Sequence, residues 1–174
     1  FSLFFQFFIS ISVTSCDDDN MVLPEKTLLE VHQENLNTVS INGFQMSYLE
    51  AGASNDKTLI LLLGIPTSSF LYRKVVENIA ADAGFRVIAP EMLGFGQSDK
   101  PQTANILTVS EQAQRVFDFA TAIGVDDFVL GLHDVSGIWG MSMLKKSEAN
   151  RILGLVLTDT NVGLEGSTPS PTNL

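Results

Sequence analysis

The sequence predicts an α/β fold, in which helices cover both faces of a mostly parallel sheet. First, short apolar runs alternate with longer segments of helical periodicity between residues 57 and 157. Second, these runs are continuously apolar, as in strands that are buried on both faces. Third, the 174 residues are 45% hydrophobic and 17% charged, which suits one domain with a substantial core. Parallel strands need right-handed crossovers, and these place helices on both faces.

The first half of the chain predicts a hairpin, two buried strands and the helix between them. Residues 38–49 alternate in polarity around an Asn-Gly pair, which is a strong signal for a tight hairpin turn. Residues 58–63 and 85–89 are apolar runs that we expect to be strands. A helix is expected over residues 70–83, and the apolar stripe on its inner face comprises Leu71, Val75, Val76 and Ile79.

The second half predicts a loop, a helix and two further strands. Residues 92–101 are rich in Gly, Ser and Asp and predict a loop. Thr108 and Glu111 have the spacing of a capping box, so a helix is expected to begin there. Its expected inner stripe comprises Val109, Ala113, Val116, Phe117, Ala120 and Ile123. Residues 128–132 and 152–157 are apolar runs that predict strands.

A sharp change from strand to helix within residues 128–144 is the most informative feature. The apolar run breaks at His133 and Asp134, and the small residues Ser136 and Gly137 precede a helical pattern. Strand, tight turn and helix form the setting in which a nucleophile is held out at the carboxyl end of a sheet. The side chain at the tip belongs to Asp134, so the candidate nucleophile is a carboxylate.

Further polar residues fall at the same edge of the sheet, where folds of this class bind ligands. We expect Glu91 and Asp99 to brace the Gly-rich loop. Asp159 ends the last strand and is a candidate triad acid, although a turn residue at a strand end is the favoured interpretation. His133 is expected to lie behind the turn, because neighbouring residues of an extended segment project to opposite sides.

Three motifs resemble the α/β-hydrolase fold superfamily, and within it the haloalkane dehalogenase and epoxide hydrolase branch. They lie in the loop after the first buried strand, in the Gly-rich loop and at the sharp turn. Their sequences are Gly64-Ile65-Pro66-Thr67-Ser68-Ser69-Phe70-Leu71-Tyr72-Arg73, the segment from Val87 to Pro101, and Leu132-His133-Asp134-Val135-Ser136-Gly137. The resemblance extends over residues 39–160 and implies a small-molecule substrate.

The resemblance implies that Asp134 attacks an epoxide, haloalkane or related small electrophile and forms a covalent ester, which water then hydrolyses. It also implies that the backbone N–H groups of Ile65 and Val135 form the oxyanion hole. Dehalogenases usually place Asn or Glu where Ile65 lies and Trp where Val135 lies, and those side chains serve halide release. Ile65 and Val135 are aliphatic and lack these groups, which argues against dehalogenation.

Two other functions are compatible with the sequence. One is a Ser-type esterase with Ser136 as nucleophile, although Ile138 would then occupy a position where a tight turn needs a small residue. The other is a non-catalytic binding module that keeps the fold and lacks the chemistry, which Leu63, Ile65 and Val135 suggest.

Composition and the remaining motifs argue against several kinds of partner. The net charge of −10 argues against a nucleic-acid surface. No metal-ligand cluster or phosphate loop is recognisable, so we expect no metal and no cofactor. The two histidines are His32, expected to be solvated in the N-terminal segment, and His133. Neither corresponds to the catalytic His of the superfamily.

Residues 1–15 are interpreted as a signal-peptide remnant, because they form an uncharged, Phe-rich run shorter than the ~20 residues that span a membrane. Together with Cys16 they resemble a bacterial lipoprotein signal, so Cys16 is the expected lipidation site. Residues 16–37 would then form a polar tether to the membrane. The expected location is the bacterial cell envelope, at the outer membrane or cell surface. The alternative is a buried apolar segment with an inert Cys.

Residues 38–174 are expected to form an incomplete α/β-hydrolase core. The superfamily places a helical cap, further strands and the catalytic His after the strand at residues 152–157, and nothing in residues 158–174 corresponds to them. We therefore expect the 174-residue chain alone to be inactive.

Overall fold

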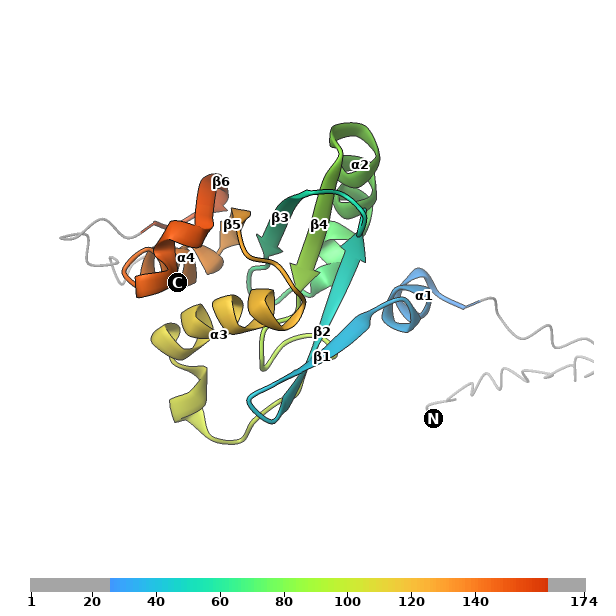
Figure 1. Ribbon diagram of the computed structural model, residues 1–174. Coiled ribbons are helices and arrows are strands. Elements are labelled where there is room, and N and C mark those ends of the chain that lie inside the picture. Colours follow the sequence, from blue (N-terminus) through green and yellow to red (C-terminus); the bar gives the residue numbers. More distant parts are fainter. Residues whose placement is uncertain (1–25, 163–174) are drawn as a thin grey trace, which may run out of the picture.

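Six strands form one sheet in the order β1-β2-β4-β3-β5-β6 in the computed structural model, which describes residues 26–162 (Figure 1). The strands are β1 (Asn37–Ile41), β2 (Phe44–Ala51), β3 (Lys57–Leu62), β4 (Phe85–Pro90), β5 (Phe128–Asp134) and β6 (Ile152–Thr160). The pairs β1–β2 and β2–β4 are antiparallel, whereas β4, β3, β5 and β6 are parallel. The predicted mostly parallel sheet is confirmed.

Helices lie on both faces of this sheet, as predicted (Figure 1). They are α1 (Leu28–Glu34), α2 (Arg73–Ala83), α3 (Val109–Ala122) and α4 (Ser136–Met143). Short 3-10 turns lie at Ser69–Tyr72, Ala104–Leu107 and Ser147–Arg151. The helix α2 covers one face, and α3 and α4 cover the other.

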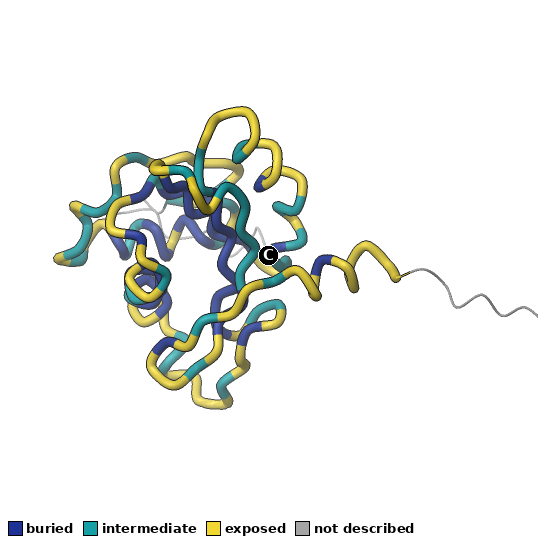
Figure 2. The backbone as a smooth tube through the Cα atoms, turned by 45° about the vertical axis from the view of Figure 1, so that its right-hand side comes forward, coloured by how far each residue is buried: buried dark blue, intermediate teal, exposed yellow. Residues whose placement is uncertain are grey.

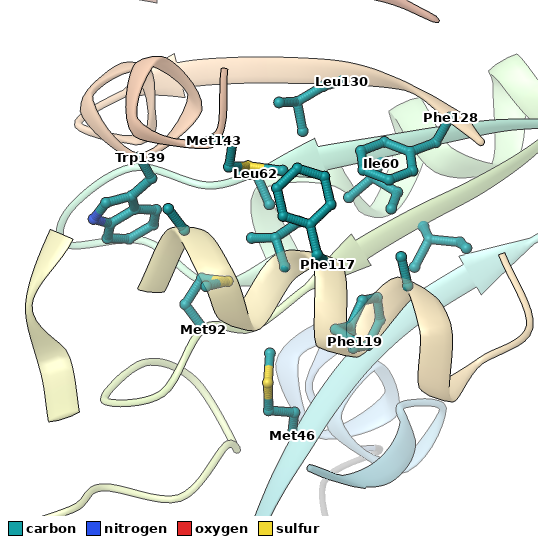
Figure 3. Close-up of a cluster of buried hydrophobic side chains, with 14 of the residues drawn as sticks. Met46, Ile60, Leu62, Met92, Phe117, Phe119, Phe128, Leu130, Trp139 and Met143 are labelled. Atoms are coloured by element: carbon teal, nitrogen blue, oxygen red, sulfur yellow. The ribbon is translucent and has the colours of Figure 1, made fainter. Parts of the chain in front are cut away.

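The central strand β3 shows why the apolar runs are continuous. Ile60 and Leu62 belong to the hydrophobic cluster that includes α3 and α4, which Figure 3 shows in close-up. Leu59 and Leu61 pack with Val76 of α2 on the opposite face. Because successive side chains of a strand alternate between faces, a strand covered on both sides must be apolar at every position.

The hairpin between β1 and β2 is the one predicted. Asn42 has φ 51° and Gly43 has φ 85°, so both turn residues occupy the left-handed region. A two-residue turn of this kind matches the natural twist of the two strands, and Asn-Gly tolerates it best. Ile41 consequently pairs with Phe44 across the turn.

The predicted inner faces of two helices are wrong in part. The chain makes a 3-10 turn before α2, and its three residues per turn place Leu71 out of phase with the α-helix, so Leu71 is exposed. In α2, Val76 is buried while Val75 is exposed. Val109, the first residue of α3, is also exposed, because it lines an open groove beside α4.

The polar tether predicted for residues 16–37 is wrong in its C-terminal part, because residues 28–34 form α1 and β1 begins at Asn37. Thr27 caps this helix: its hydroxyl accepts from the Glu30 N–H, and the Glu30 carboxylate accepts from the Thr27 N–H. The Thr-x-x-Glu spacing is a capping-box signal that was readable in the sequence. Figure 2 shows α1 beside the core and exposed along most of its length.

The expected lipid anchor lies outside the described residues. The signal-peptide remnant (1–15), Cys16 and the following residues up to 25 belong to this part of the chain. The lipid anchor and the envelope location therefore stay predictions. Within residues 26–162, no helix has the length and apolar character needed to cross a membrane.

Candidate active site

Asp134 lies at the sharp turn between β5 and α4, as the sequence predicts. Its φ is 55°, in the left-handed region, which few residues other than glycine, Asn and Asp adopt and which occurs repeatedly at active sites. The residue is exposed. The turn thus holds a strained and accessible carboxylate at the carboxyl end of the sheet.

The two predicted oxyanion donors converge on one oxygen of Asp134. The Ile65 N–H donates to Asp134 Oδ1 at 3.2 Å, and the Val135 N–H donates to the same oxygen at 2.6 Å. No described residue donates a hydrogen bond to Oδ2 of Asp134. Among residues 26–162, hydrogen bonds to Asp134 therefore hold one carboxylate oxygen, Oδ1, and none is made to Oδ2.

Gly64 allows the loop after β3 to come this close to Asp134. A Cβ atom at Gly64 would lie 2.4 Å from the Asp134 Cβ, closer than real Cβ atoms approach. The Thr67 N–H and hydroxyl both donate to the Gly64 carbonyl oxygen, at 3.1 and 2.7 Å, and they close the loop into a tight turn. Residues 64–69 are called the oxyanion loop below.

Two glycines in α4 let this helix lie against the end of the sheet. Leu132, two residues before Asp134, is large for a turn of this kind, and a Cβ at Gly140 would lie 2.3 Å from its Cδ1 atom. A Cβ at Gly137 would lie 2.2 Å from the Thr160 hydroxyl oxygen. Gly140 therefore provides the space that the Leu132 side chain occupies. The sequence pattern does not reveal that the small residue at 140 offsets the large one at 132.

Ser136 is buried and its hydroxyl is hydrogen-bonded within the turn. Its Oγ accepts from the His133 N–H at 2.8 Å and lies 2.7 Å from the His133 carbonyl oxygen and 3.1 Å from that of Leu62. A hydroxyl has one proton to donate and two lone pairs, and these contacts use the proton and one lone pair. The geometry gives Ser136 a structural role in holding the turn.

His133 is half-buried beside the turn, consistent with the prediction that it lies behind it. Its ring Nδ1 is buried and has no hydrogen-bond partner among the described residues. No hydrogen bond in this part of the chain joins the His133 ring to Asp134. The structure thus gives no support to His133 as the base for Asp134.

Asp159, the candidate triad acid, lies at an irregularity in the pairing of β5 with β6. His133 pairs with Thr158 and Asp134 pairs with Thr160, so Asp159 is the extra residue of a bulge. It is exposed, with φ 42°. Bulges beside active sites commonly redirect a side chain. The pairing of β6 with β5 places Asp159 beside the turn at Asp134. No described His ring forms a hydrogen bond with Asp159.

A buried cluster of Glu91, Ser69 and His32 lies next to the oxyanion loop, and sequence reasoning missed it as a unit. Glu91 is 1% exposed, and its Oε1 accepts from the Ser69 N–H at 3.1 Å and the Ser69 hydroxyl at 2.7 Å. Its Oε2 accepts from the Gln97 N–H. The expectation that Glu91 braces the Gly-rich loop fits this contact, and it braces the oxyanion loop as well.

The expectation that His32 is solvated is wrong, because its side chain is only 6% exposed. Its Nε2 lies 2.9 Å from the Ser69 hydroxyl, 37 residues away in the sequence. Burial lowers the pKa of His32 from its ordinary value of 6.5, the Glu91 carboxylate opposes this shift, and the Arg73 guanidinium adds to it. The capping box that begins α1 is the one sequence signal that pointed to ordered structure here.

An open groove of about 320 Å³ begins one helical turn beyond Asp134 along α4. Its lining is largely apolar and comprises Val109, Ile138, Met141, Ser142, Lys145 and Val162. Within residues 26–162, no three His, Cys, Asp or Glu side chains gather so that they could hold a metal ion.

The sequence profile of the alpha/beta hydrolase fold family matches residues 57–173, which contain the turn, the oxyanion loop and the parallel strands. The chain belongs to this family. The chain is 30% identical over 115 residues to a haloalkane dehalogenase of Mycolicibacterium paratuberculosis. It is 32% identical over 114 residues to haloalkane dehalogenase 1 of Mycobacterium tuberculosis. These matches cover 66% and 65% of this chain, and 38% and 37% of the relatives.

Solved structures agree with this assignment. The chain is similar to a tetrameric haloalkane dehalogenase from Paraglaciecola agarilytica, with a TM-score of 0.64, 28% identity, and coverage of 74% of this chain and 44% of that one. It also shares its fold with an epoxide hydrolase of Bacillus megaterium, with a TM-score of 0.64, 19% identity, and coverage of 72% and 43%. The chain thus spans less than half the length of these relatives.

Proposed function

We propose that this protein uses Asp134 as a nucleophile and forms a covalent ester with an epoxide, a haloalkane or a related small electrophile. The main support for this proposal is that the two carboxylate oxygens of Asp134 differ in their hydrogen-bond partners. Oδ1 accepts from the Ile65 and Val135 N–H groups, whereas no described residue donates to Oδ2 of this exposed side chain. The relatives named as haloalkane dehalogenases support the class of substrate.

In the first step, Oδ2 attacks an sp3 carbon of the electrophile. A carbon–oxygen bond forms, and the bond from that carbon to the halogen or to the epoxide oxygen breaks. The leaving group departs as halide, or as an alkoxide that takes a proton from water. Oδ1 becomes the carbonyl oxygen of the ester and keeps the two N–H partners it already has.

In the second step, water loses a proton to a base and adds to the ester carbonyl carbon, so that negative charge returns to Oδ1. The Ile65 and Val135 N–H groups then stabilise this charge, and precedent assigns about 3–4 kcal/mol to one such donor. The bond from this carbon to Oδ2 then breaks, the product leaves as an alcohol after taking up a proton, and the Asp134 carboxylate is regenerated. The step needs a base to take a proton from water. Asp159, at the bulge beside Asp134, is our candidate for the carboxylate that orients such a base.

The first step needs no base, so it can be tested on this chain directly. The purified protein is incubated with an aryl-substituted epoxide or a bromoalkane, and the peptide that contains Asp134 is analysed by mass spectrometry. We expect a saturable adduct on Asp134 with at least one of the two probes, and none in Asp134→Asn. The absence of an adduct with both probes would favour a non-catalytic module. An adduct that persists in Asp134→Asn and disappears in Ser136→Ala would favour the Ser-type esterase.

A further inference from the structure

The helix α1 has an unusual contact with the rest of the molecule. His32 is its one buried residue, whereas Leu28, Leu29 and Val31 are 74%, 45% and 42% exposed. A helix that packs for stability normally buries its apolar side chains and leaves polar ones in water. Here the reverse holds, so the contact of α1 with the core depends on a polar side chain and its partner.

The partner of His32 is the Ser69 hydroxyl, and the direction of this hydrogen bond can be assigned. Ser69 Oγ lies 2.7 Å from Glu91 Oε1, and a carboxylate oxygen only accepts, so the hydroxyl proton points to Glu91. The 2.9 Å contact between His32 Nε2 and Ser69 Oγ then requires an N–H on Nε2. A chain of hydrogen bonds therefore runs from His32 through Ser69 to Glu91.

Ser69 is also the last residue of the oxyanion loop, whose other end holds the Ile65 N–H on Asp134. The two ends are only four residues apart, and the Thr67 bonds to the Gly64 carbonyl make the segment between them stiff. The next residue, Phe70, also contacts His32. The His32 ring packs edge-on against the Phe70 ring with 5.2 Å between their centres, and the Arg73 guanidinium lies 4.0 Å from the centre of the Phe70 ring.

We propose that α1 is a clamp on the oxyanion loop, in which His32 acts through Ser69 as a positioning residue for the Ile65 N–H. The clamp limits movement of the loop away from Asp134, so Oδ1 keeps both of its donors. The catalytic consequence rests on the proposed function of Asp134, whereas the effect on the Ile65 amide does not.

The test compares His32→Ala, His32→Gln and Leu28→Ala in the full chain. Gln carries an N–H group at a similar distance from the backbone and is the conservative replacement. Leu28 is exposed on the same helix and provides the control. One readout is the solvent exchange of the Ile65 and Val135 amide protons by NMR. The other is the rate constant of ester formation at Asp134 with saturating epoxide, together with the epoxide concentration at half-saturation.

We expect His32→Ala to accelerate Ile65 exchange by about tenfold or more and to slow ester formation by about tenfold, since small displacements of positioned groups have effects of this size. Val135 exchange and the half-saturating concentration stay unchanged. His32→Gln restores both quantities to within about threefold of the wild type, and Leu28→Ala leaves them unaltered.

Unchanged Ile65 exchange in folded His32→Ala would overturn the clamp, as would an equal effect of Leu28→Ala or a lack of rescue by His32→Gln. If His32→Ala does not fold, Ser69→Ala carries the same test, because it removes the bridging hydroxyl and keeps the Ser69 N–H bond to Glu91. If the wild type forms no ester while Ile65 exchange responds as expected, the proposed function fails and the clamp stands.

Discussion

Asp134 and Glu91 are two carboxylates at the same edge of the sheet, and their surroundings are opposite. Asp134 is exposed on a backbone with φ 55°, and two N–H groups hold only one of its oxygens. Glu91 is 1% exposed, and donors from Ser69 and Gln97 occupy both of its oxygens. Both carboxylates contact the oxyanion loop, one at each end.

From this difference we infer two roles, a reactive carboxylate at Asp134 and a carboxylate at Glu91 that holds loops in place. A carboxylate can attack a carbon only if one oxygen is free and accessible, and Asp134 meets this condition. A buried carboxylate whose oxygens are all occupied stabilises the loops that donate to it, and Glu91 does this for the oxyanion and Gly-rich loops. Substitutions at the two sites should therefore affect different measurements.

The largest effect is expected for Asp134→Asn, which keeps the shape and tolerates a positive φ but removes the nucleophile. We expect ester formation to fall by at least about a thousandfold, as for loss of a nucleophile elsewhere. The free energy of unfolding should change by less than about 1 kcal/mol, because the side chain is exposed. Mass spectrometry and denaturant unfolding measure the two quantities. A variant that still forms the ester would remove Asp134 from the mechanism.

The next effect is expected for Gly64→Ala, which probes the approach of the oxyanion loop to Asp134. The added Cβ would lie 2.4 Å from the Asp134 Cβ, so the loop must move away. We expect a loss of about a hundredfold in the rate of ester formation and about 1–3 kcal/mol of stability. The matched control is Gly154→Ala, where a Cβ meets nothing within 4 Å. Equal rates in the two variants would contradict the close approach.

Glu91→Ala should show the opposite balance, with a large effect on stability and a smaller one on reactivity. Removing this carboxylate leaves the Ser69 and Gln97 N–H groups without their buried acceptor, at a cost of about 2–4 kcal/mol. Ester formation at Asp134 should still be detectable in the folded protein. Asp82→Ala, at an exposed position in α2, is the control and should change stability by less than about 0.5 kcal/mol. Loss of the ester in folded Glu91→Ala would undo the separation of the two roles.

The smallest effect concerns pH. The pKa of His32 in the folded state is below its ordinary value of 6.5, because burial disfavours the charged ring. The unfolded chain therefore takes up a proton first, and stability falls as the pH drops below 6.5 toward the folded pKa. His32→Gln lacks this titration, so the difference in unfolding free energy between wild type and variant should narrow in that window. Thermal unfolding at pH 7.5 and 5.5 measures it, and a difference that widens at low pH would contradict the assignment.

The turn at Asp134 could be predicted because local pattern determines it, whereas the donors at Ile65 and Val135 were implied by the resemblance to the α/β-hydrolase fold. The apolar run of β5, the small residues after Asp134 and the motif that begins at Gly64 are contiguous signals, and the structure brings them together. The Asn-Gly hairpin was predictable for the same reason. These features follow from short stretches of sequence whose conformations are restricted.

The contacts between distant segments could not be predicted in this way. His32 meets Ser69 across 37 residues, and no periodicity or spacing in α1 indicates that its one buried residue is polar. The space for Leu132 likewise comes from Gly140, eight residues later, on another element. Such pairings depend on how the elements pack, and a pattern read along the chain does not contain that information.

The most direct test of the account is the location of covalent modification. The protein is treated with a small epoxide at limiting concentration, digested, and every modified carboxyl or hydroxyl group is located by mass spectrometry. We expect an ester on Asp134 and none on Glu91 or Ser136. Modification of Ser136, or equal modification of exposed carboxylates in general, would show that the open oxygen of Asp134 has no special reactivity.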